Sequence, residues 1–211
     1  MSLSSAFFNR DPRRVARALL GKVLIRKTSR GVLSGRIVET EAYLGKDDAA
    51  AHTASGKTSR NAVLFGPPGF TYVYFIYGNY YCLNVSCLPD GVPGGVLFRA
   101  LEPLAGVKEM SAGRGLGVPG PEDLKRISWL RKISSGPGRI CEAFGITRAR
   151  DNGKSLVSSR SDLQIVDDRY RVRRIVVGPR VGITKSAEEP LRYLIAENPF
   201  VSVPVRPPVK A

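Results

Sequence analysis

The sequence has few of the residues that build metal sites or disulfide-stabilised folds. Its 211 residues include one histidine, His52, and three cysteines, Cys82, Cys87 and Cys141, none of them in a CxxC pair. A structural zinc site needs more closely spaced ligands than these. We therefore expect a reduced, intracellular protein with no metal and no cofactor.

Long hydrophobic runs are also lacking. No segment approaches the roughly 18–20 apolar residues that span a bilayer, and residues 1–14 do not resemble a signal peptide. Hydrophobic residues make up 43% of the chain, which is enough for a core. We expect one domain over residues 1–211, ending in an extended tail over 199–211, with no membrane partner.

Acidic residues are the third shortage. Lys and Arg number 33 against 18 Asp and Glu, which gives a formal net charge of +15. Guanidinium groups suit phosphate oxygens, so nucleic acid is the expected partner. An acidic membrane surface and a general charge bias of the source organism are alternatives. The prominent arginines are Arg13, Arg14, Arg17, Arg169, Arg171, Arg173, Arg174 and Arg180.

The order of apolar, capping and turn residues predicts an α+β fold with a mostly antiparallel, curved sheet flanked by helices and a protruding aromatic hairpin. Asp11 and Pro12 suit the start of a helix that ends at Gly21. Further helices are expected near 48–52 and over 124–133 and 139–144. Strands are expected over 22–27, 33–44, 94–101, 163–166 and 173–177, with Glu102-Pro103 ending the third of these.

Five tyrosines crowd the segment 69–84, namely Tyr72, Tyr74, Tyr77, Tyr80 and Tyr81. Two β-rich runs separated by Gly-Asn predict a β-hairpin. An aromatic hairpin tip on a cationic protein suits entry into a base stack, because its rings replace the stacking of a displaced base. The alternative is packing in a core, since tyrosine also suits strands.

The segment 36–43, RIVETEAY, has two carboxylates and a tyrosine at alternate positions of a predicted strand. Alternate residues of a strand point the same way, so Glu39, Glu41 and Tyr43 share a face and the glutamates lie roughly 6.5–7 Å apart. A carboxylate beside an aromatic ring can act as a base next to a stacking wall. Paired carboxylates also occur in glycoside hydrolases. A solvated strand face, with a glutamate paired to an arginine, is the other interpretation.

Several segments resemble, in order and spacing, the alkyladenine (3-methyladenine) DNA glycosylase family. They are RIVETEAYLG (36–45), AAHTASGKTSRN (50–61), PGFTYVYFIYGNYYCLNVS (68–86) and VLFRALEP (96–103), supported by 7–24, 136–146 and 179–193. The resemblance covers nearly the whole chain. It implies an enzyme that flips damaged purines of the 3-methyladenine, hypoxanthine or ethenoadenine type from double-stranded DNA and hydrolyses the N-glycosidic bond.

The resemblance also implies roles for particular residues. Glu41 matches the general base that activates a water, and Arg99 matches the residue that holds this water and keeps the glutamate ionised. Tyr77 matches the wedge that fills the gap in the duplex. The residues matching the sandwich around the flipped base are Tyr43, His52 and Tyr74.

Two weaker correspondences complete the expected pocket. Asn84 matches a side chain that rejects the exocyclic amine of guanine, and Ile183 matches a residue whose backbone carbonyl places the water. None of the residues matched to the pocket is a lysine, and Lys46 and Lys57 lie in the polar region around them, so we expect a monofunctional enzyme that leaves an abasic site. The turn 136–138 could hold a phosphate at a helix start or could be an ordinary helix start.

A monomer without an obligate protein partner is expected, because scanning duplex DNA requires no dimer symmetry. The expected location is the cytoplasm and nucleoid, or the nucleus in a eukaryote. A non-catalytic protein that binds lesions is the alternative function, against which the presence of both Glu41 and Arg99 argues.

Hairpin register gives a geometric prediction. A two-residue Gly78-Asn79 turn pairs residues whose numbers sum to 157 and places Tyr74 and Asn84 on opposite faces. A three-residue loop with a bulge gives a sum of 156 and places them on the same face. Because both are expected at one pocket, we predict a bulge or a longer loop.

Overall fold

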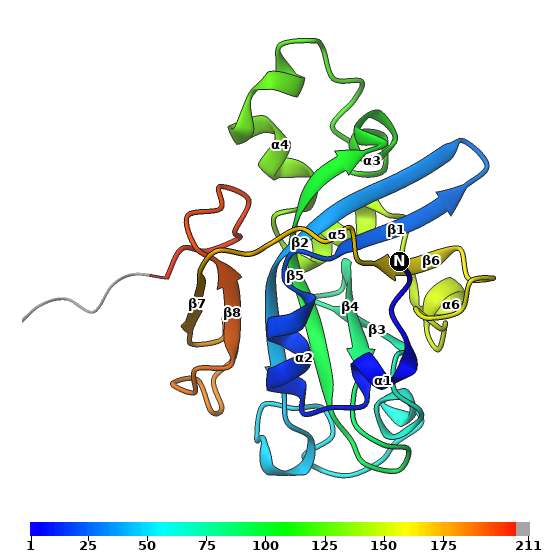
Figure 1. Ribbon diagram of the computed structural model, residues 1–211, viewed down its shortest axis with the longest axis vertical. Coiled ribbons are helices and arrows are strands. Elements are labelled where there is room, and N and C mark those ends of the chain that lie inside the picture. Colours follow the sequence, from blue (N-terminus) through cyan, green and yellow to red (C-terminus); the bar gives the residue numbers. More distant parts are fainter. Residues whose placement is uncertain (206–211) are drawn as a thin grey trace, which may run out of the picture.

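Strand β2 (Gly31–Tyr43) is the centre of the fold, which we describe from a computed structural model covering residues 1–205 (Figure 1). It lies in one eight-stranded antiparallel sheet with the order β3-β4-β5-β2-β1-β6, and β8 joins β2 and carries β7. The predicted α+β class is confirmed. The other strands are β1 (Val23–Thr28), β3 (Thr71–Ile76), β4 (Tyr80–Ser86), β5 (Gly95–Ala105), β6 (Leu163–Val166), β7 (Ile175–Gly178) and β8 (Arg192–Ile195).

Six short helices accompany the sheet within the described residues. They are α1 (Ser5–Phe8), α2 (Pro12–Leu19), α3 (Val107–Gly113), α4 (Ile127–Ser134), α5 (Pro137–Ala143) and α6 (Arg148–Asp151). Helix α2 begins as predicted, because the side chain of Asp11 accepts a hydrogen bond of 2.8 Å from the N–H of Arg13. Its end is followed by Gly21 at φ +83°, a backbone conformation that favours glycine.

Helix α2 packs on one face of β2, as Figure 1 shows. The hydroxyl of Thr40 donates a hydrogen bond of 3.0 Å to the carbonyl of Ala16 in this helix. Because neighbouring residues of a strand point to opposite faces, Glu39 and Glu41 lie on the face away from α2. The helix therefore closes one side of the sheet and leaves the other side for the site.

Strands β3 and β4 pair in the register that the pocket requires. Tyr72 lies opposite Asn84, and Tyr74 lies opposite Cys82, so paired numbers sum to 156. Residues 77–79 connect the strands as a three-residue loop. The two-residue turn at Gly78-Asn79 is therefore excluded, and the register prediction is confirmed.

Two predicted boundaries are wrong. Strand β5 does not end at Glu102-Pro103 but continues to Ala105, because Pro103 pairs with Gly35 beside a register shift, where a missing N–H is tolerated. The helix expected over 124–133 is interrupted at Arg126, whose extended backbone separates a 3₁₀ turn (Asp123–Lys125) from α4.

The prediction of a helix near 48–52 is also wrong. A 3₁₀ turn (Gly45–Asp47) is followed by a series of turns. The carboxylate of Asp48 accepts hydrogen bonds from the N–H groups of Leu44 and Ala50, each 3.1 Å long. These N–H groups bind a side chain in place of helix carbonyls, so the segment folds around Asp48.

Residues 199–205 of the predicted extended tail form no helix or strand, and the rest of the tail, 206–211, lies outside the described residues. Among residues 1–205, no helix has the length and apolar character needed to cross a membrane.

Candidate active site

A cavity of about 610 Å³ lies beside the β3–β4 hairpin, β5 and the loop after β7. This volume is within the usual range for small-molecule sites. Of the eight residues to which the resemblance assigns a role, seven line it, and Glu41 is the exception. The predicted residues in its lining are Tyr43, His52, Tyr74, Tyr77, Asn84, Arg99 and Ile183.

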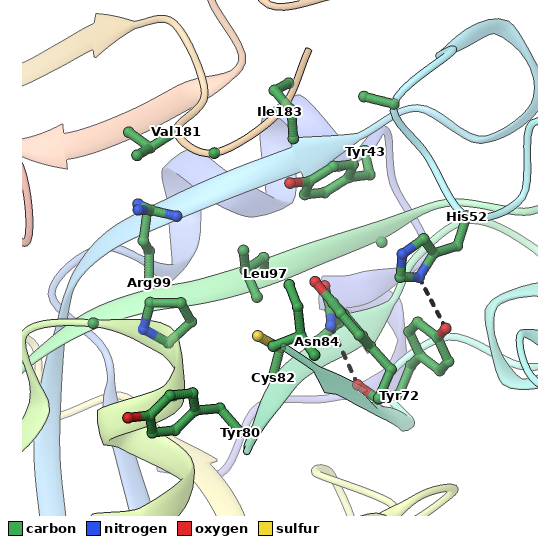
Figure 2. A pocket seen from close by; sticks show the side chains of 18 of the residues that line it. Tyr43, His52, Tyr72, Tyr80, Cys82, Asn84, Leu97, Arg99, Val181 and Ile183 are labelled. Carbon is green, nitrogen blue, oxygen red and sulfur yellow. Dashed lines mark hydrogen bonds between the residues drawn. The ribbon is translucent and has the colours of Figure 1, made fainter. Parts of the chain in front are cut away.

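Aromatic rings form one wall of this cavity. Nδ1 of His52 lies 2.9 Å from the hydroxyl of Tyr72, as the dashed line in Figure 2 shows. The His52 ring also meets the ring of Tyr74 edge-on, with centroids 4.5 Å apart. Burial lowers the pKa of His52, and the nearby Arg60 lowers it further. The lowered pKa favours the neutral imidazole, and the contacts with Tyr72 and Tyr74 orient the ring.

Asn84 lies in the cavity with one amide hydrogen already used. Its Nδ2 donates a hydrogen bond of 3.3 Å to the carbonyl of Tyr72, its partner across the hairpin. An amide nitrogen has two hydrogens, so one donor is available to a bound molecule. The cross-strand bond sets the plane of this amide.

Glu41 lies behind the cavity wall and is 0% exposed. Its Oε1 accepts a hydrogen bond of 2.8 Å from the N–H of Val181, and its Oε2 accepts one of 3.1 Å from the hydroxyl of Tyr43. Nη1 of Arg99 lies 3.4 Å from Oε1. Val181, Tyr43 and Arg99 all line the cavity, so each joins the carboxylate to it (Figure 2).

The environment of Glu41 sets its protonation. Burial raises the pKa of this carboxyl above its ordinary value, although Arg99 and the Val181 N–H act in the opposite direction. Such a carboxyl can exchange a proton at a pH closer to neutrality than a surface glutamate can. A solvated strand face at this position is excluded by the burial.

Glu39 is equally buried but has different partners. Its Oε1 accepts a hydrogen bond of 2.9 Å from Arg192, and its Oε2 accepts one of 2.6 Å from the N–H of Ser202. Nε of Arg99 lies 3.2 Å from the same Oε1. Glu39 therefore joins Arg99 to the C-terminal part of the described chain, while Glu41 contacts the cavity lining.

Tyr77 has the most exposed of the tyrosine rings that line the cavity. It lies in the hairpin loop, is 76% exposed and has φ +54°, a conformation that is uncommon for residues other than glycine. The predicted wedge is thus presented to solvent at the edge of the site.

Sequence reasoning missed three residues at this site. Tyr72 and Cys82 line the cavity, and the 156 register could have identified them, since they lie opposite Asn84 and Tyr74. The N–H of Val181 carries no side-chain signal that a sequence could show. Ile183 lines the cavity, and the role of its carbonyl stays a prediction.

The prominent arginines do not form one surface at the cavity. Arg180 is buried and pairs with Asp48, so it is wrong to count it as a phosphate-binding side chain. The exposed Arg14 and Arg17 belong to α2, on the sheet face opposite Glu41. Arg139 at the start of α5 lines the cavity. That the turn 136–138 binds a phosphate stays a prediction.

Comparison with known proteins shows the family of the chain. The family model described as methylpurine-DNA glycosylase (MPG) matches residues 6–199. A protein of Koribacter versatilis (strain Ellin345), whose name makes it a candidate 3-methyladenine DNA glycosylase, is 64% identical over 200 residues, which are 95% of this chain and 92% of that protein.

Two further relatives carry the same name. One, from Burkholderia cenocepacia (strain HI2424), is 46% identical over 198 residues, covering 93% of this chain and 89% of the relative. The other, from Methanocella arvoryzae (strain DSM 22066 / NBRC 105507 / MRE50), is 45% identical over 199 residues, covering 93% of each chain. The resemblance inferred from the motifs is confirmed, and the chain belongs to the methylpurine-DNA glycosylase family.

Proposed function

We propose that this protein is a DNA repair glycosylase that flips a damaged purine out of double-stranded DNA and hydrolyses its N-glycosidic bond. The observation that carries the proposal is the position of Glu41, a buried carboxylate bound by three groups of an aromatic cavity, Tyr43, Arg99 and Val181. Family membership supports DNA as the substrate.

Base flipping is assigned to the hairpin loop. The exposed ring of Tyr77 enters the duplex and occupies the space that the flipped nucleotide leaves. Unstacking a base costs a few kcal/mol, and an inserted ring offsets part of that cost. The net charge of +15 attracts the phosphate backbone and makes binding dependent on salt.

The cavity receives the flipped base between the rings of Tyr43, His52 and Tyr74. Electron-rich ring faces attract an alkylated, cationic purine and stack with a neutral one. The free amide hydrogen of Asn84 meets the exocyclic amine of guanine donor to donor, so normal guanine is disfavoured.

Hydrolysis is assigned to Glu41. A carboxylate has about four acceptor positions. Val181 and Tyr43 donate hydrogen bonds to two of them and Arg99 forms an ion pair 3.4 Å away, so a position is left for a water hydrogen. The water oxygen bonds to C1′ as the bond to the base nitrogen breaks, its proton passes to Glu41, and the base leaves with the bonding electron pair. The carboxylate also opposes the positive charge that develops on the sugar.

The proposal includes a monofunctional, monomeric enzyme. A glycosylase with lyase activity needs an amine nucleophile, and the described residues that line the cavity include no lysine. The product is therefore an abasic site. Sedimentation of the free protein tests the monomer, since a dimer would appear at twice the mass of 23.0 kDa.

Base release under single-turnover conditions tests the proposal. Duplexes with one hypoxanthine or one ethenoadenine, together with methylated DNA, cover the expected lesions. The proposal predicts release of at least one base, an abasic product, and no covalent complex when borohydride is added. Absence of release from all three substrates would contradict it, and a borohydride-trapped complex would contradict the monofunctional mechanism.

A second candidate function is lesion binding without cleavage. The complete burial of Glu41 favours it, because this carboxylate is not among the residues that line the cavity. Binding that is tight and steeply dependent on salt, without release of any base, would support this candidate.

A further inference from the structure

Asp48 and Arg180 form a buried ion pair next to the cavity. Nη1 of Arg180 lies 2.5 Å from Oδ2 of Asp48, and Nη2 lies 2.8 Å from Oδ1. The two side chains are 1% and 0% exposed. Two parallel contacts of this kind fix the plane of the guanidinium as well as its position.

The same guanidinium contacts the ring of Tyr43. Its central carbon lies 4.7 Å from the ring centroid, within the range of a cation–π interaction. Tyr43 is one of the residues that line the cavity, whereas Arg180 lies outside that set. Figure 2 shows the Tyr43 ring at the cavity wall, beside the segment that carries Val181 and Ile183. Arg180 therefore contacts the ring from the side away from the cavity.

Backbone contacts hold both charges in place. Nη1 of Arg180 also donates a hydrogen bond of 3.0 Å to the carbonyl of Ala42. Asp48 accepts from the N–H groups of Leu44 and Ala50. The pair thus joins the backbone on both sides of Tyr43 to the loop after β7 and holds the guanidinium beside the ring.

We propose that Arg180 is a specificity-determining residue that lowers the preference of the cavity for cationic bases, an inference that rests on the proposed function. A tyrosine face attracts cations because its π electrons carry partial negative charge. A guanidinium fixed behind the ring repels a second positive charge in front of it, and a neutral purine escapes this repulsion. The cavity consequently accepts neutral damaged purines beside alkylated cations.

Replacing Asp48 and replacing Arg180 are expected to change the preference for a cationic base in opposite directions, which a purely structural role would not produce. Arg180→Met removes the positive charge behind the ring, so the preference for a cationic base rises. Asp48→Asn leaves the guanidinium without its counter-charge, so that preference falls. Loss of structure alone would disturb the ring in both variants and would not move the preference in opposite directions.

The experiment compares two single-turnover rates, release of cationic 3-methyladenine from methylated duplex and release of neutral hypoxanthine from a matched duplex. The ratio of the first rate to the second is expected to rise about two- to fivefold in Arg180→Met, the size of an exposed cation–π contact, and to fall in Asp48→Asn. The control is Arg17→Met, since the Arg17 guanidinium lies 5.3 Å from the ring of Tyr193, outside the cavity. Its ratio is expected to equal that of the wild type.

The double variant Arg180→Met/Asp48→Asn keeps the test decisive if either single variant fails to fold. It buries no unpaired charge, and its ratio is expected to rise because the guanidinium that contacts the ring is gone. Ratios that stay at the wild-type value, or that change in the same direction in both single variants, would overturn the inference. Failure of the wild type to release either base would instead contradict the proposed function.

Discussion

The backbone N–H of Val181 donates a hydrogen bond of 2.8 Å to Oε1 of Glu41, a residue 140 positions earlier in the chain. The donor belongs to the loop after β7, and the acceptor belongs to the central strand β2. Glu41 thus has its full set of partners only when the C-terminal third of the chain is folded against the sheet.

Glu39 and Glu41 are expected to differ in their effect on stability. Glu39→Gln removes the counter-charge of Arg192 from a buried site and should lower the free energy of unfolding by about 3 kcal/mol. Glu41→Gln should change it by less than about 1 kcal/mol. A neutral amide costs less to bury than a carboxylate, and Arg99 keeps Glu39 as its counter-charge. Urea unfolding of both variants measures the difference. Equal losses in the two variants would contradict the division of roles.

The pH dependence of base release should report Glu41. Burial raises the pKa of this carboxyl above its ordinary value of 4.5. A general base must be ionised, so the release rate should rise with pH through the raised pKa. Measuring the release rate from pH 4 to 9 tests this. A rate that falls only at or below pH 4.5 would contradict it.

The same pKa predicts a change in stability with pH. Between 4.5 and the raised pKa, the folded protein holds a proton that the unfolded chain has lost. The contribution of Glu41 to the free energy of unfolding therefore falls as pH rises through this window. Glu41→Gln lacks this contribution, so its stability relative to the wild type should increase over the same window. Unfolding at several pH values measures the difference, and a constant difference would show an unshifted pKa.

Tyr77 should affect activity on duplex DNA without affecting the fold. Its ring is 76% exposed, so Tyr77→Ala should change the free energy of unfolding by no more than about 0.5 kcal/mol. Release from a duplex should slow by about tenfold or more, the size of one lost base–aromatic stack, and release from a single strand should change far less. Tyr170→Ala, at a partly exposed ring stacked on Arg36, is the matched control. Equal slowing on single and double strands would contradict the wedge.

Local sequence patterns predicted the elements whose stability is local. Asp11 and Pro12 mark the start of α2 because capping involves a few neighbouring residues. The register of the hairpin, in which paired residue numbers sum to 156, was predicted from the requirement that Tyr74 and Asn84 lie on one face. In both cases the information lies within a short segment.

Other features depend on partners far away in the sequence. The carboxylate of Asp48, around which the non-helical segment 48–52 folds, also pairs with Arg180, 132 residues later. Likewise, the partner of Glu41 is a backbone N–H, which has no signature in the side chains. Long-range pairing of this kind also buries Arg180, a residue that the excess of basic residues alone had associated with phosphate binding.

The most direct test of the account is base release by wild type and Glu41→Gln under single-turnover conditions, on a duplex with one hypoxanthine and on methylated DNA, with DNA binding measured on the same preparations. Release is expected to fall by at least about a hundredfold in the variant, the usual contribution of a general base, while DNA binding is retained. Release at the wild-type rate by Glu41→Gln would contradict the assignment of Glu41 as the residue that activates water.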